Sequence, residues 1–300
     1  MSFGGSQGVL GLGAAAIWGA ADFSGGLAAK RAAPAFVVAV AHGFSLILLL
    51  AAALLLHTAF SGHVFYGLLS GVFCGAGLIA LYSALSRGSM GLSAAISGVL
   101  TAVVPVLFSL FSDNRLRTDH ASPLRLIGFA VAAVAIWLIA YTPEPSAPEN
   151  RSAARTHPRS LGLAALAGLC FGVMLIFMHL AAAQGVLRAL IAMRITSTSV
   201  AALAGILLWL AQRRGEPGGL GFPAGKLLLL AMLAGVLDTS GNLLYLFASL
   251  AGRLDVAAVL SALYPAGTTL LAAWLLKERA TRSQAAGMAL ALAAVVLILT

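Results

Sequence analysis

Long apolar segments, separated by short polar ones, fill nearly the whole chain. A helix needs about 20 mostly apolar residues to cross a bilayer, and ten segments come close to that length. They lie at 8–28, 35–56, 64–85, 92–111, 124–141, 161–183, 189–210, 225–250, 254–276 and 283–299. Several connections hold only a few residues, so neighbouring helices are expected to run antiparallel. The pattern predicts an all-α membrane protein with ten transmembrane helices.

One longer polar stretch divides these segments into two sets of five. Residues 142–160, TPEPSAPENRSAARTHPRS, are rich in proline and in charged residues. The stretch has no apolar face that a membrane helix could use. We therefore expect a first five-helix unit at 1–141, a polar linker at 142–160 and a second five-helix unit at 161–300.

The two units share a repeated sequence. The motif VLTAVVP at 99–105 returns as VLSALYP at 259–265, and upstream glycine pairs such as Gly71 and Gly235 lie 164 residues apart. Because each copy holds an odd number of helices, the second copy must enter the membrane from the opposite side. Two inverted repeats around a central cavity are typical of secondary transporters.

Composition supports the membrane assignment. Hydrophobic residues make up 61% of the chain and charged residues 9%, against about 45–50% and about 25% in soluble domains. The formal charge of +9 does not indicate nucleic-acid binding, because the basic residues stand largely at segment ends, as in membrane proteins. Cys74 and Cys170 lie inside apolar segments, so no disulfide, metal site or cofactor is predicted.

Ionisable residues inside the apolar segments are candidates for function, since each costs about 2.5–3.5 kcal/mol to insert at the bilayer centre. Asp22 lies in the first segment, Arg194 in the seventh and Asp238 in the eighth. Asn242 follows Asp238 by one helical turn and shares its face. Asp238 stands where the first copy has Cys74, which makes it the strongest candidate. In the alternative interpretations, Arg194 snorkels to the headgroups or pairs with the aspartates as structural support.

Two histidines and several aromatic residues complete the candidate binding site. His42 and His179 either bond to backbone carbonyls or relay protons. Trp18, Tyr82, Tyr245 and Tyr264 either line the cavity or belong to interfacial belts and core packing. In a cavity with these groups, Arg194 would hold a carboxylate through a bidentate contact and an aspartate would hold an ammonium group. Such a cavity would suit a small zwitterion.

Two prolines occupy matching places in the fourth and ninth segments. Pro105 and Pro265 each lie more than ten residues into their segment. A proline there removes a backbone hydrogen bond and bends the helix. The pair predicts either symmetry-related bends at a moving gate or static kinks that improve packing.

Sequence motifs of enzymes do not support catalysis. There is no H-E-x-x-H pair for zinc and no P-loop for ATP. The run GGSQG at 4–8 fits the letters of a nucleophile elbow, but no strand precedes it. We expect neither an enzyme nor an ATP-driven pump.

The second copy carries a motif of a known family. PAGTTLLAAWLLKER at 265–279, followed by Gly287, resembles the signature of the EamA branch of the drug/metabolite transporter superfamily, and residues 17–19 resemble its opening helix. The first copy departs from the pattern at 114–117, where NRLR replaces the expected glutamate and arginine. Glu278, the glutamate of the motif in the second copy, therefore has no counterpart, which weakens the case for a functional role of this residue. The resemblance implies a basket-shaped ten-helix bundle that works by alternating access. Many relatives export amino acids or other metabolites from bacteria, and some export aromatic amino acids.

The sequence gives conflicting signals about which side of the membrane holds the two termini. With both termini in the cytoplasm, only six of the 18 lysines and arginines would lie in inside loops. The positive-inside rule alone thus favours termini outside, whereas the family resemblance favours termini inside. We expect cytoplasmic termini.

These observations predict an exporter of small metabolites, amino acids foremost, in the bacterial inner membrane. Transport is either downhill or coupled to protons, with Asp22 or Asp238 as the proton carrier. The alternatives are a multidrug or nucleotide-sugar carrier of the same fold, an intramembrane enzyme acting on lipid, and a membrane scaffold or sensor without transport. The expected partners are a small-molecule substrate and membrane lipid, not nucleic acid.

Overall fold

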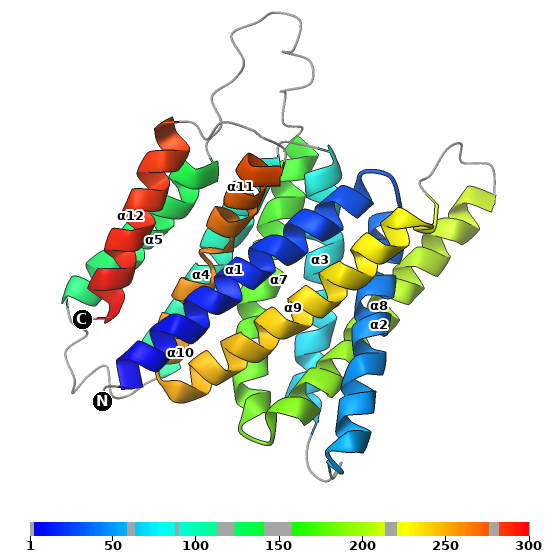
Figure 1. Ribbon diagram of the computed structural model, residues 1–300, viewed down its shortest axis with the longest axis horizontal. Helices are drawn as coiled ribbons and strands as arrows, with labels where there is room; N and C mark the ends of the chain where they lie inside the picture. Colours follow the sequence, from blue (N-terminus) through cyan, green and yellow to red (C-terminus); the bar gives the residue numbers. More distant parts are fainter. Residues whose placement is uncertain are drawn as a thin grey trace, which may run out of the picture.

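The computed structural model describes residues 3–58, 64–87, 90–112, 123–140, 158–213, 221–275 and 282–299. All regular structure in these ranges is helical (Figure 1). The helices are α1 Phe3–Ala29, α2 Pro34–Leu55, α3 Phe65–Arg87, α4 Met90–Ser112, α5 Pro123–Ala140, α7 Pro158–Ala182, α8 Val186–Arg213, α9 Lys226–Ala251, α10 Leu254–Ser261, α11 Tyr264–Leu275 and α12 Arg282–Leu299. Most of the expected linker, residues 142–157, and the motif residue Glu278 lie outside the described residues.

Five of the described helices are long and apolar enough to cross a bilayer. They are Pro34–Leu55, Phe65–Arg87, Arg159–Ala182, Val186–Ala211 and Lys226–Ala251. Shorter apolar stretches occur at Ile96–Ser109, Leu126–Leu138 and Leu254–Thr268. The described helices therefore support a multi-pass membrane protein.

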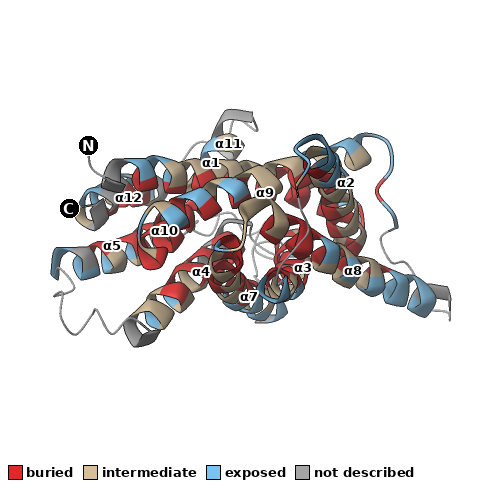
Figure 2. Ribbon diagram, turned by 90° about the horizontal axis from the view of Figure 1, so that it is seen from below, coloured by how far each residue is buried: buried red, intermediate tan, exposed pale blue. Residues whose placement is uncertain are grey.

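Large apolar side chains cover the outside of the bundle. Leu54, Leu55 and Leu229 are 75%, 80% and 66% exposed, and Figure 2 shows that buried residues face the interior while exposed ones follow the outer faces. An apolar outer surface of this extent marks contact with lipid. The core that holds the helices together lies at the inward faces.

Helices from the two halves of the chain pack against each other. The most extensively packed pairs are α1 with α9, α3 with α7, α5 with α12, α3 with α8, and α4 with α7, and α2 also packs against α8. Figure 1 shows α1 and α9 side by side, and α5 beside α12. Each of these pairs joins a helix of the first half to a helix of the second half. The two halves therefore form one bundle, and both contribute residues to its centre.

Glycines make these close approaches possible. A Cβ on Gly235 of α9 would overlap the carbonyl of Ala41 in α2, and a Cβ on Gly71 of α3 would overlap the carbonyl of Met193 in α8. Small residues at such crossings let helix backbones come together, as is common in membrane bundles. The same kind of contact therefore occurs between α2 and α9 and between α3 and α8.

The ninth expected segment is not one bent helix, and this prediction was wrong. The helix ends at Ser261 and a new one begins at Tyr264. Pro265 is the second residue of α11, where a missing N–H costs little because first-turn donors have no partner within the helix. Pro105, by contrast, lies inside the continuous helix α4. The two matched prolines thus have different structural effects.

Candidate functional site

Four helices bring polar side chains together near the bundle centre. His42 comes from α2, Cys74 from α3, Arg194 from α8 and Asp238 from α9. Nη2 of Arg194 donates to Oδ2 of Asp238 at 2.5 Å, and His42 Nε2 lies 3.5 Å from the same oxygen. The Arg194 and His42 side chains are fully buried, and Asp238 is 14% exposed. Arg194 therefore points inward to Asp238 and does not snorkel.

The other two nitrogens of Arg194 also have hydrogen-bond partners. Nε donates to the Thr239 hydroxyl at 3.1 Å, and Nη1 reaches the Cys74 sulfur at 3.7 Å. Asn242 adds a hydrogen bond from Nδ2 to Asp238 at 3.1 Å. Thr239 was not among the predicted residues, although it directly follows Asp238. With each nitrogen engaged, Arg194 has no free edge for a bidentate contact to a substrate carboxylate.

The cluster contains an arrangement that repeats across the two halves. Gly71 packs on the carbonyl of Met193, and Gly235 packs on that of Ala41, so the next residues along α8 and α2, Arg194 and His42, occupy corresponding places. The Arg194–Cys74 and His42–Asp238 contacts then correspond to each other. The sequence predicted that Cys74 and Asp238 occupy equivalent positions in the two copies. It did not reveal that His42 and Arg194 also occupy corresponding positions, because neither these residues nor their neighbours in the sequence are alike.

Three residues of the cluster could in principle hold a metal ion. The ligand atoms of His42, Cys74 and Asp238 lie within 4.8 Å of one another. Imidazole, thiolate and carboxylate together suit a transition metal. However, the guanidinium of Arg194 contacts both the Cys74 sulfur and the Asp238 carboxylate. A fixed positive charge at this place opposes the binding of a metal cation.

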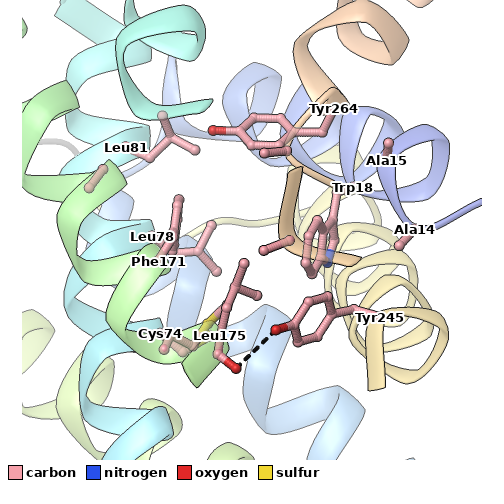
Figure 3. Packing of buried hydrophobic residues seen from close by; sticks show 14 of the residues in the cluster. Ala14, Ala15, Trp18, Cys74, Leu78, Leu81, Phe171, Leu175, Tyr245 and Tyr264 are labelled. Carbon is pink, nitrogen blue, oxygen red and sulfur yellow. Dashed lines mark hydrogen bonds between the residues drawn. The ribbon is translucent and has the colours of Figure 1, made fainter. Parts of the chain in front are cut away.

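A small cavity adjoins the cluster and reaches both halves of the chain. It is lined by Trp18, Asp22, Cys74, Leu78, Thr101, Phe171, Met174, Leu175, Asp238 and Tyr264. Figure 3 shows Trp18 and Tyr264 facing Leu78 and Phe171 across it. The cavity measures about 30 Å³, which holds about two water molecules. In this conformation it is too small for an amino acid.

The aromatic candidates fall into two groups. Trp18 and Tyr264 line the cavity. Tyr245 stacks on Trp18 with ring centroids 5.9 Å apart, and its hydroxyl donates to the Leu175 carbonyl at 3.0 Å (Figure 3). Tyr82 is buried with its ring against Gly25 of α1. Tyr245 and Tyr82 thus shape the core around the cavity and do not line it.

The last predicted residues lie apart from this centre. His179 is in the last turn of α7, and neither His179 nor the prolines Pro105 and Pro265 belong to the cavity lining. Pro265 packs beside Gly98 of α4. The structure therefore assembles the charged residues, one histidine and two of the four aromatic residues at the centre.

Comparison with known proteins adds to this picture. Residues 159–300 match the EamA-like transporter family. The match covers the second half of the chain, supports the drug/metabolite transporter superfamily, and indicates a membrane transporter of small molecules. No curated protein matches the chain. A solved crystal structure at 17% identity aligns with 98% of this chain and 96% of its own, with a TM-score of 0.74. At this identity the similarity concerns the fold alone.

Proposed function

We propose that the protein is a secondary transporter that exports small amine-bearing metabolites across the bacterial inner membrane by alternating access. The observation that carries the proposal is the central cavity, where Asp22 and Asp238 face a common space between the two halves of the chain. Acidic residues in a membrane interior are costly and usually serve transport or binding. The family match of the second half supports the same conclusion.

The two halves are proposed to form inverted repeats, and equivalent contacts support this. Nε2 of Gln7, at the start of α1, donates to the carbonyl of Ala248 at 3.2 Å. The hydroxyl of Ser160, at the start of α7, donates to the carbonyl of Ala84 at 3.0 Å. Ala84 and Ala248 are one of the pairs that lie 164 residues apart. The same tie between a first helix and a third helix thus occurs twice, each time across the halves.

A second pair of contacts follows the same rule. Gly241 in α9 leaves room for the Trp18 ring of α1, and Gly77 in α3 leaves room for the Phe171 ring of α7. Gly77 and Gly241 are also 164 residues apart. A repeat of several side-chain contacts in corresponding places is difficult to explain without a common structural plan for the two halves.

Alternating access gives the Gln7 and Ser160 contacts a role. In Figure 1, α1 begins at the lower edge of the bundle and α7 at the upper edge, so the two contacts lie near opposite faces. Each would hold one face closed, and release of one at a time would open the cavity to one side. With both contacts formed, the cavity measures only about 30 Å³, so a metabolite could enter only after one of them is released.

The acidic lining of the cavity also argues against the alternative of a nucleotide-sugar carrier. An anionic substrate such as a nucleotide sugar would face two aspartates in the cavity and no basic lining residue. An ammonium group would find a carboxylate partner there. Asp22, which forms no ion pair with any described residue, is also the group that could carry a proton if transport is coupled.

Counterflow into proteoliposomes loaded with mixed amino acids and amines tests the proposal. We expect uptake above protein-free vesicles, and a clear loss of uptake in Asp238→Asn with the protein still monodisperse and helical. Ser240→Ala is the control, because its hydroxyl bonds to its own helix at Val236 and does not line the cavity. No uptake of any compound by folded protein would favour a scaffold or sensor. Normal uptake by Asp238→Asn would exclude Asp238 from the mechanism.

A further inference from the structure

The fixed charges at the bundle centre do not balance. Asp238 is paired with Arg194 at 2.5 Å. Asp22 is buried in α1 and forms no ion pair with any residue in the part of the chain that the structure describes. The central pair is therefore neutral, and Asp22, when it is ionised, leaves one negative charge in the cavity without an ion-pair partner among the described residues. A buried charge without a partner is costly, so such a site favours a cation or a proton as its partner.

Among the described residues, no basic side chain lines the cavity to bind an anion. The ten lining residues include two aspartates and no lysine, arginine or histidine. Arg194 is the nearest cation in the network, but its side chain is fully buried and its nitrogens bond to Asp238, Thr239 and Cys74. A substrate carboxylate would therefore face like charges without a compensating partner.

The other lining groups suit an ammonium ion and a neutral acceptor. The rings of Trp18 and Tyr264 share the cavity with Asp22, and aromatic faces attract ammonium groups. Trp18 Nε1 is buried and bonds to no described partner, and the buried Tyr264 hydroxyl lies close to the hydroxyls of Ser97 and Thr101. Both can donate to an uncharged oxygen, such as the carbonyl of an amide. These donors are neutral, so they do not offset the charge of an ionised Asp22.

From this lining we infer that the cavity selects organic cations that carry an ammonium group and no carboxylate, with Asp22 as the residue that binds the ammonium. The inference rests on the proposed transport function and narrows its substrates from amine-bearing metabolites in general to simple amines and amino-acid amides. The carboxylate of an amino acid is the feature that the cavity rejects. The zwitterion predicted from the sequence required a free Arg194, which the ion pair with Asp238 removes.

Matched ligand pairs that differ only by a carboxylate test the inference. We would compare phenethylamine with phenylalanine, isoamylamine with leucine, and cadaverine with lysine, by calorimetric titration of the purified full chain and by counterflow. We expect the amine of at least one pair to bind ten-fold or more tightly than its amino acid and to be taken up above protein-free vesicles. Equal or tighter binding of the amino acids, with uptake, would overturn the inference and leave the transport proposal standing. Absence of binding and uptake for all six compounds would overturn both.

Two substitutions assign the effect to Asp22. Asp22→Asn should remove the ten-fold preference for the amine, whereas Asp22→Glu, which keeps the charge, should retain most of it. Asp22→Asn also removes a charge without a partner, so its melting temperature should be equal to or above that of the unchanged protein. A preserved preference in Asp22→Asn, or a lowered melting temperature in that variant, would contradict the role of Asp22.

Discussion

The ion pair between Arg194 and Asp238 should carry a large and measurable coupling free energy. Removing one partner of a buried pair costs about 3–5 kcal/mol, because the other charge is left without compensation. Asp238 can take up a proton when Arg194 is lost, so we expect Arg194→Met and Asp238→Asn to cost about 3 kcal/mol each. The double variant leaves neither charge and loses mainly the hydrogen bond from Arg194 to Thr239, so it should cost about 2 kcal/mol. The coupling is then about 4 kcal/mol.

Equilibrium unfolding in mixed micelles, followed by helical circular dichroism, measures all four proteins of this cycle. Arg253 and Asp255 provide the control pair, with contacts of 3.0 and 2.7 Å but with the Arg253 side chain 39% exposed. A partly exposed pair of this kind should couple by about 1 kcal/mol or less. The reasoning is refuted if the central substitutions are additive within about 0.5 kcal/mol, because Arg194 and Asp238 would then not compensate each other.

Three further predictions follow from packing and burial. Gly235→Ala should destabilise the protein by about 2 kcal/mol or more, because the added methyl group would overlap α2. Gly162→Ala is the control and should be neutral or stabilising, because nothing lies within 4 Å of its Cβ position. A Gly235→Ala variant with an unchanged thermal melt would contradict the close crossing of α9 and α2. Tyr245→Phe should cost about 1 kcal/mol in the same melts, since it leaves a buried carbonyl without its hydroxyl partner. A polar maleimide should modify Cys74, which lines the cavity, only when substrate opens the protein. Equal modification of Cys74 with and without substrate, measured by mass spectrometry, would argue against that opening.

The class of the protein could be predicted from the sequence because its signals are local. The length of an apolar segment and the scarcity of charge depend on neighbouring residues only, and these features predicted a helical membrane protein correctly. The candidate charges Asp22, Arg194 and Asp238 could also be recognised, since any ionisable residue in an apolar segment is costly wherever it points. The motif near Pro265 identified the family that residues 159–300 match.

Tertiary structure alone decided which of these residues meet. Helix rotation depends on packing between segments far apart in the chain, such as Gly235 against Ala41, and one sequence does not reveal it. That packing placed His42 beside Asp238 and gave Arg194 its three partners, so the arginine that seemed suited to a substrate carboxylate proved to be engaged already. It also ended a helix at Ser261, where the sequence predicted only a bend. The charge balance of the cavity, on which the choice of substrate depends, exists only once the two halves of the chain are packed together.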